Sequence, residues 1–105
     1  MLITITNEEK VQVTLAPTTA AGNPATLDGA PTWTVTTGDA TLEVAADGLS
    51  AFLVSGAADT NSQVTVTADA DLGEGVVTLT DTIDLAVVAA SASALGAIVA
   101  TPVLK

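Results

Sequence analysis

Several residue types that enzymes use for catalysis are missing from this chain of 105 residues. It contains no His, Cys, Arg or Tyr, so a Ser or Thr nucleophile would have only a Lys or a carboxylate as its base. A developing oxyanion would have no cationic side chain other than a Lys beside it. Paired carboxylates that hydrolyse a glycoside need a cleft between them, and a domain of this size has little room for one. We therefore expect a protein without enzymatic activity.

Positive charge is almost absent as well. Lys10 and Lys105 are the only cations against twelve Asp and Glu residues, which gives a formal net charge of -10. The resulting field repels phosphate backbones and anionic lipid headgroups, so we expect neither nucleic acid nor a membrane surface as a partner. Because there is no Cys, no disulfide stabilises the fold, and the redox compartment is left undetermined.

Two stretches of the sequence bear on export and on membrane insertion. Residues 1–10, MLITITNEEK, contain no basic region, no apolar core and no small-residue cleavage site, so we expect synthesis in the cytoplasm without a signal peptide. The uncharged run at residues 85–103 consists mostly of Ala, Ser, Thr and Gly, with Pro102 near its end. A membrane span needs about 20 predominantly apolar residues, so this composition argues against one.

What the chain does contain is alternation between apolar and polar residues, with eighteen Thr among the latter. Its centre is residues 31–48, where Trp33 and Val35 fall on one face of an extended segment and Thr residues on the other. Since the chain has one Phe and no Tyr, Trp33 is its largest apolar side chain, and we expect the core to form around it. Asp47 and Gly48 predict a hairpin turn before the next strand.

Similar alternation predicts further strands, of which the first two are either separate or one bent strand: residues 2–6, 10–16, 49–54, 63–68 and 76–88. Asp81 has the same parity as the apolar residues Leu79 and Ile83. We expect a β-bulge or a strand break there, because a lone buried carboxylate is costly. About seven strands separated by turn signals are typical of a small all-β, antiparallel β-sandwich.

One strand has apolar residues on both faces. Leu49, Ala51 and Leu53 can face the core, which leaves Phe52 and Val54 pointing outward. These two residues are either covered by a neighbouring loop or form a docking patch for a partner.

The second apolar feature is the tail, residues 89–105, which follows the sandwich at residues 1–88 and is apolar on both faces when extended. It either completes its own sheet, docks on or adds a strand to another subunit, or remains disordered. Its large apolar residues join Phe52 and Val54 as interface candidates: Leu95, Ile98, Val99, Val103 and Leu104.

The acidic turn at residues 69–75, DADLGEG, contains the best candidate metal ligands of the chain. Asp69, Asp71 and Glu74 are oxygen donors at short spacing in a Gly-containing turn, which suits a hard cation such as calcium. The regular ligand series and the distal Glu of a full calcium loop are missing. The turn is therefore either an acidic, solvated hairpin turn or a weak calcium site.

Several short motifs follow one another along residues 10–88. They are KVQVTLAP at 10–17, GNP at 22–24, LDG at 27–29, TWTV at 32–35, ADGL at 46–49 and VTVTA at 64–68. In order and spacing they resemble the bacterial immunoglobulin-like domains of invasin and intimin-type adhesins, which also occur in bacteriophage virion proteins. The acidic turn and the ending LGAIVATPVLK look like the small single-domain forms carried by tailed phages and prophages.

The resemblance implies an immunoglobulin-like β-sandwich that has no catalytic residues and acts through protein-protein contacts. It implies a structural protein of the virion, above all a capsid decoration or cement protein. Its expected partners are then capsid or other virion proteins, together with further copies of itself on the assembly. The alternative is an adhesion or stalk module of a bacterial surface protein. This sequence departs from that pattern, because it shows neither a tandem array nor an export signal.

Overall fold

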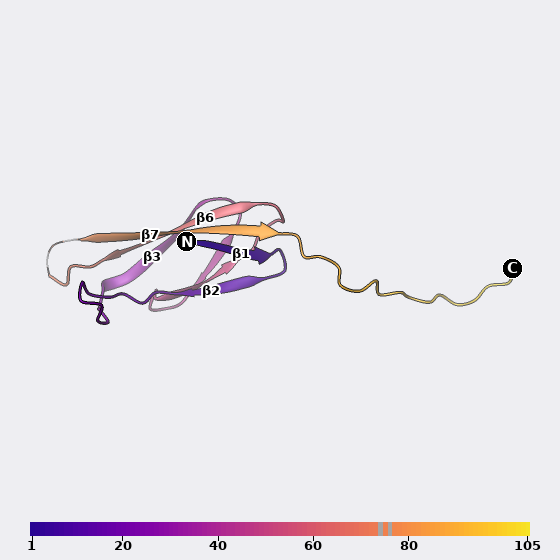
Figure 1. Cartoon of the computed structure of the whole chain (residues 1–105), viewed down its shortest axis with the longest axis horizontal. Helices are drawn as coiled ribbons and strands as arrows, with labels where there is room; N and C mark the ends of the chain where they lie inside the picture. The colour runs from indigo at the N-terminus through magenta and orange to yellow at the C-terminus, as the bar shows by residue number, and fades with distance from the viewer. Residues whose placement is uncertain (74, 76) are drawn as a thin grey trace.

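The computed structural model describes residues 1–73, 75 and 77–105, and within them the chain is all-β, without a helix. Its strands, most of them labelled in Figure 1, are β1 (Leu2–Thr6), β2 (Lys10–Thr14), β3 (Asp28–Thr37), β4 (Thr41–Val44), β5 (Ser50–Val54), β6 (Asn61–Asp69) and β7 (Thr78–Val88). They follow the alternating stretches of the sequence, because successive side chains of a strand point to opposite faces. The all-β prediction is confirmed.

The strands form two sheets in a sandwich-like arrangement. One sheet has the order β1-β7-β6-β3 and the other the order β2-β5-β4. Four of the strand pairs are antiparallel, whereas β1 and β7 are parallel. The wholly antiparallel prediction is therefore wrong for this pair. The chain crosses between the sheets at residues 7–9, so β1 and β2 pair with different neighbours instead of with each other.

Hydrogen bonds hold this crossing in place. Asn7 N–H donates to the Val88 carbonyl at 2.9 Å, and Thr6 N–H donates to Glu9 Oε1 at 2.8 Å. The second bond lowers the pKa of Glu9, because it stabilises the ionised carboxylate. The sequence leaves open whether residues 2–16 form one bent strand or two, and the structure has two strands, one in each sheet.

The core lies between the sheets and centres on β5, β6 and β7. Its most deeply buried residues are Leu53, Val64, Ile83, Leu85 and Val87. Trp33 is buried as predicted, with 9% of its surface exposed, and belongs to the same apolar cluster. Its indole N–H donates to the Gly48 carbonyl at 2.8 Å, which ties β3 of one sheet to the β4–β5 hairpin of the other. Trp33 therefore joins the two sheets, while smaller aliphatic residues form the centre of the core.

The hairpin predicted at Asp47 and Gly48 is confirmed. β4 and β5 pair antiparallel, from Thr41 opposite Val54 to Val44 opposite Ala51. Gly48 has a φ of 71°, a conformation that glycine adopts without strain. The Asp47 Oδ1 atom accepts a hydrogen bond from the Leu49 N–H at 3.0 Å, as turn aspartates commonly do.

Strand β7 has no bulge or break at Asp81, so that prediction is wrong. Its pairing with β6 keeps one register from Thr78 opposite Asp69 to Ala86 opposite Asn61. Asp81 has the inward parity but is exposed, because β2 ends at Thr14 and the space opposite this part of β7 is an open groove. The carboxylate stays hydrated there, and the desolvation cost that motivated the prediction does not arise.

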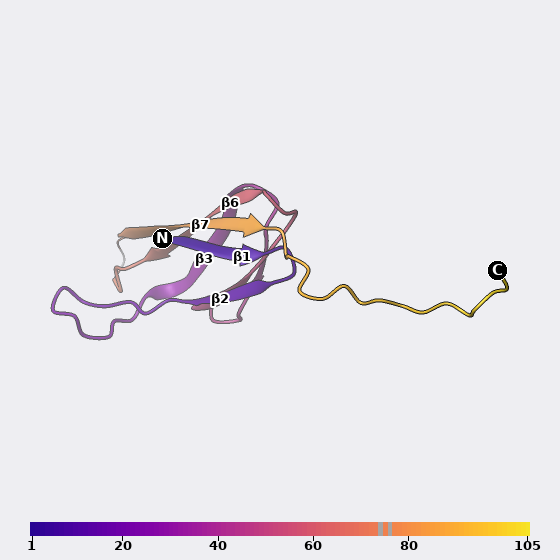
Figure 2. The same ribbon diagram turned by 45° about the vertical axis from the view of Figure 1, so that its right-hand side comes forward.

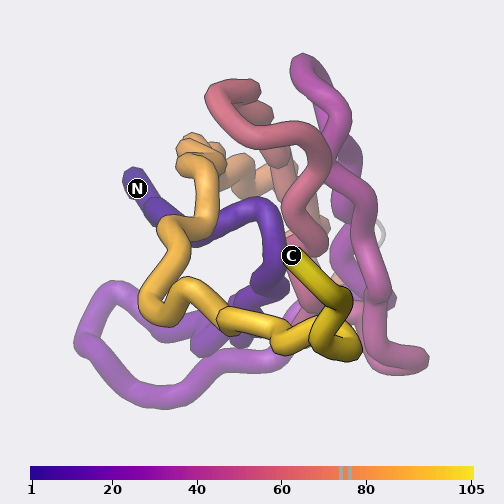
Figure 3. The backbone as a smooth tube through the Cα atoms, turned by 90° about the vertical axis from the view of Figure 1, so that its right-hand side faces the viewer, coloured from indigo at the N-terminus to yellow at the C-terminus, as the bar shows by residue number. Residues whose placement is uncertain are grey.

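The tail leaves the two-sheet body, residues 1–88, at the end of β7 and contains neither strand nor helix. The molecule measures 83 × 23 × 23 Å, and the tail extends along its long axis (Figure 1). Ala90 N–H donates to Asn7 Oδ1 at 2.9 Å and holds the start of the tail against the β1–β2 turn. Viewed from this end, the tail lies in front of the body (Figure 3). In this structure the tail completes neither sheet of its own body.

Candidate protein-binding surfaces

The tail exposes five large apolar side chains to solvent. They are at least 89% exposed and comprise Leu95, Ile98, Val99, Val103 and Leu104. Monomeric soluble proteins rarely leave apolar residues gathered in this way without a partner. The structure thus places the predicted tail residues where another surface can reach them, and their role in docking stays a prediction.

Phe52 and Val54 lie on the outer face of the β2-β5-β4 sheet, and both are half-buried. Phe52 stands between Gln12 on β2 and Glu43 on β4. Lys10 Nζ lies 4.5 Å from the centre of the Phe52 ring and 2.8 Å from Glu43 Oε1. The lysine therefore lies over the ring while it pairs with the glutamate. A partner that docks on Phe52 has to displace this ion pair, an exposed contact of small energy.

In the acidic turn, carboxylate oxygens hold the backbone. Asp69 Oδ1 accepts from the N–H groups of Asp71 at 2.9 Å and Val77 at 3.0 Å, and Asp71 Oδ1 accepts from Gly73 N–H at 2.9 Å. These are the local side-chain turns that aspartate favours. Glu74, the third predicted ligand, lies outside the described residues. Among the residues that are described, no group of three or more His, Cys, Asp or Glu side chains is arranged to hold a metal ion.

We expect calcium to leave the melting temperature of the protein unchanged, because Asp69 and Asp71 already use carboxylate oxygens as backbone acceptors. The measurement is a thermal melt in millimolar calcium and in chelator. A higher melting temperature in calcium would contradict this expectation, since an ion that binds only the folded state stabilises it. The Asp69→Asn variant is the control, because it keeps the acceptor oxygen and removes the charge that a cation needs.

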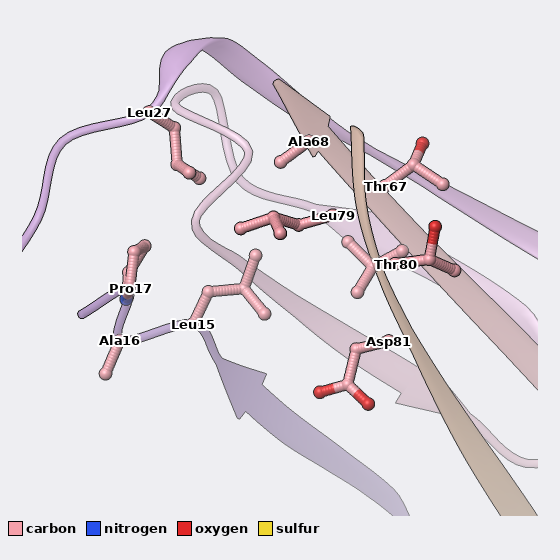
Figure 4. Close-up of a pocket in the computed structure, with 10 residues that line it drawn as sticks. Leu15, Ala16, Pro17, Leu27, Thr67, Ala68, Leu79, Thr80 and Asp81 are labelled. Carbon is pink, nitrogen blue, oxygen red and sulfur yellow. The ribbon is translucent and has the colours of Figure 1, made fainter. Parts of the chain in front are cut away.

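An apolar groove at the end of the body where β7 begins escaped the sequence-based predictions. It has a volume of about 370 Å³ and lies between residues 15–17, which follow β2, and the strands β6 and β7. Figure 4 shows Leu15, Leu27 and Leu79 directed into the same space, with Asp81 beside it. Leu79 is 52% exposed although it has the inward parity of its sheet. The loop between β2 and β3 projects at this same end, opposite the tail (Figure 2).

One signal in the sequence does point to this groove. Asp81 interrupts the series of apolar residues on the inward face of β7. Such an interruption has two structural causes. Either a bulge turns the residue outward, or the strand reaches an end of the sandwich where an inward side chain meets water. The first was predicted and the second is observed. A charged residue at an inward position of a strand therefore indicates one of two structures: a β-bulge, or an end of the sandwich that is open to water.

Replacing Asp81 with Leu is expected to leave the free energy of unfolding unchanged to within about 0.5 kcal/mol, or to raise it. Among the described residues its carboxylate accepts one hydrogen bond, from Thr82 N–H at 2.9 Å, and the side chain is exposed. A leucine there gains apolar contact with the other groove residues. Urea denaturation measures the difference. A loss of more than about 1 kcal/mol would show that the carboxylate makes a stabilising buried contact.

Within the described part of the chain, no helix has the length and apolar character needed to cross a membrane. Comparisons with protein families, with curated proteins and with solved structures find no match to this chain. The two-sheet fold, the exposed tail and the groove are therefore the observations from which a function is inferred.

Proposed function

We propose that this protein is a non-enzymatic structural component of a phage particle, an immunoglobulin-like domain that decorates or cements the capsid through protein-protein contacts. One observation carries the proposal. In a chain with a net charge of -10, a small two-sheet body bears a tail whose large apolar side chains are exposed to solvent. Burial of these side chains against another protein surface is favourable, because it removes apolar area from water. Exposed apolar surface of this kind marks a site of protein-protein contact.

The strand order supports the immunoglobulin-like part of the proposal. In immunoglobulin domains, strands B, E and D lie in one sheet and strands C, F and G in the other. When β2 is counted as B, the sheet β2-β5-β4 corresponds to B-E-D and the sequence β7-β6-β3 corresponds to G-F-C. Trp33 then lies on strand C, where those domains carry a buried Trp. The disulfide and the tyrosine of antibody domains have no counterpart here, so the correspondence is one of topology.

Charge narrows the kind of surface that this protein binds. The body carries all twelve acidic residues, and one of the two lysines, Lys10, forms an ion pair with Glu43. An acidic body is attracted to basic or apolar protein surfaces and is repelled by nucleic acid. These preferences suit an attachment to the outside of a protein shell, where contact with the packaged nucleic acid is not needed.

Mass spectrometry of purified particles tests the proposal. We expect this polypeptide in the particles at a fixed ratio to the capsid protein, and we expect a Val103→Asp/Leu104→Asp double variant to be lost from them. The matched control is Ala92→Asp/Ala94→Asp, which adds the same charge to exposed tail positions and keeps every large apolar side chain of the tail. Particles that lack the polypeptide would contradict the proposal.

The encoding open reading frame separates the proposal from the adhesion alternative. An export signal and further immunoglobulin-like repeats in the same frame would favour a stalk or adhesion module of a bacterial surface protein. A gene beside that of a major capsid protein would favour the particle component.

A further inference from the structure

We propose that the tail of one copy of this chain binds the groove at the opposite end of a second copy, so that copies associate head to tail. The groove is the one lined by Leu15, Leu27, Leu79 and Asp81 at the start of β7. This contact follows from the described residues alone and does not rest on the phage proposal.

The groove has the chemistry to receive an apolar peptide. Leucines from three separate segments point into it, namely Leu15 after β2, Leu27 before β3 and Leu79 on β7 (Figure 4). They stay partly or largely exposed in the isolated chain, with Leu79 at 52%. Burial of such side chains against another apolar segment is the main favourable term in association.

The edge of β7 beside the groove is open to a further strand. β1 pairs with β7 only from Leu2 opposite Asp84 to Thr6 opposite Val88. Among the described residues, 78–81 of β7 therefore have a strand neighbour on the β6 side alone. An unpaired strand edge next to an apolar groove is the arrangement that binds an extended peptide, because backbone hydrogen bonds and side-chain pockets act together.

The tail matches this site in shape and in charge. It is extended, and its apolar residues fall on both faces, so one set can enter the groove while the backbone pairs with β7. Asp81 is the single carboxylate among the groove-lining residues. Lys105 follows Val103 and Leu104 directly and has no ion-pair partner among the described residues. The last residues of the tail thus combine apolar side chains with the cation that complements Asp81.

The groove and the start of the tail lie at opposite ends of the body, which favours binding of the tail to the groove of a second copy over binding to its own. The groove lies where β7 begins, and the tail leaves where β7 ends, eleven residues later (Figure 1). The hydrogen bond from Ala90 N–H to Asn7 Oδ1 fixes the start of the tail. To reach its own groove the chain would have to reverse and run back about 35 Å along the body. A contact between unlike surfaces of identical copies repeats, so it builds rings or open chains of subunits.

Sedimentation velocity of the full chain tests the contact. We expect wild-type protein to form a concentration-dependent series of oligomers. Leu79→Asp in the groove and Val103→Asp/Leu104→Asp in the tail should each weaken association at least about tenfold. Ala92→Asp/Ala94→Asp is the matched control, because it adds the same charge to exposed tail positions without removing a large apolar side chain. Circular dichroism and Trp33 fluorescence verify folding, and Leu27→Asp, outside the strands, serves as a second groove variant.

Mixing the two defective variants gives the decisive result. Leu79→Asp retains an intact tail, and the Val103→Asp/Leu104→Asp variant retains an intact groove, so an equimolar mixture should form a 1:1 heterodimer and nothing larger. A wild-type protein that stays monomeric at all concentrations would overturn the proposal, whether the tail is free or folded back onto its own groove. Variants that associate as the wild type does, or a mixture that stays monomeric, would also overturn it.

Discussion

Replacing Trp33 with Ala is expected to lower the free energy of unfolding by about 3–5 kcal/mol, enough to unfold a domain of this size. The indole is buried in the apolar cluster, and removing it leaves a cavity between the sheets. The change also deletes the hydrogen bond from Trp33 Nε1 to the Gly48 carbonyl, 2.8 Å long, which links β3 to the β4–β5 hairpin. Both losses act at the same junction of the two sheets.

Trp33→Phe separates these two contributions. Phenylalanine keeps most of the apolar volume and removes the indole N–H, so we expect a loss of about 1–3 kcal/mol from the unpaired Gly48 carbonyl and the smaller ring. Urea denaturation followed by far-UV circular dichroism measures both variants, since neither retains a Trp to report by fluorescence. A cost below about 1 kcal/mol for Trp33→Ala would mean that the sheets do not depend on this side chain.

The second large effect is expected at Gly38, between β3 and β4. Its φ is 89°, and a Cβ atom there would overlap Ser62 Oγ and lie 2.6 Å from the Asn61 carbonyl oxygen. Ser62 is buried and its Oγ accepts a hydrogen bond from Ala40 N–H at 3.1 Å. Its Cα atom would also lie 2.6 Å from the added Cβ, so rotation of the Ser62 side chain alone cannot relieve the overlap. Gly38→Ala should therefore cost about 3 kcal/mol or more, from backbone strain and overlap together.

Gly22→Ala is the matched control for this prediction. Gly22 has a similar φ of 84°, but no atom lies within 4 Å of a Cβ built on it. It should show only the conformational cost of a left-handed residue, about 1–2 kcal/mol. Urea denaturation followed by Trp33 fluorescence gives both values. Equal costs for the two variants would show that the approach of Gly38 to β6 is not the reason for the glycine.

The strands themselves could be predicted because alternation is a local property. Whether Trp33 and Val35 share a face depends only on their spacing along an extended backbone, and the same holds for Ala51 and Leu53. The hairpin at Asp47 and Gly48 was predictable for a related reason, since the turn geometry is decided by the conformations of adjacent residues.

The arrangement of strands was predicted less well. Pairing of β1 with β7 joins residues 2–6 to residues 84–88, from opposite ends of the body, and runs parallel. No pattern within either segment specifies its neighbour or its direction. That choice depends on how the chain crosses between the sheets at residues 7–9, which is settled when the two sheets pack.

The candidate binding surfaces also divide into those predictable from the sequence and those that depend on the tertiary structure. The sequence by itself determined which apolar residues fall on an outward face or in an extended tail, because that follows from parity and composition. Phe52 and Leu104 were therefore among the predicted interface residues. Only the tertiary structure decided that Asp81 meets water at an inward position and that Leu15, Leu27 and Leu79 share a groove. Parity says which way a side chain points, whereas the length of the facing sheet decides what covers it, and here β2 ends too early to cover β7.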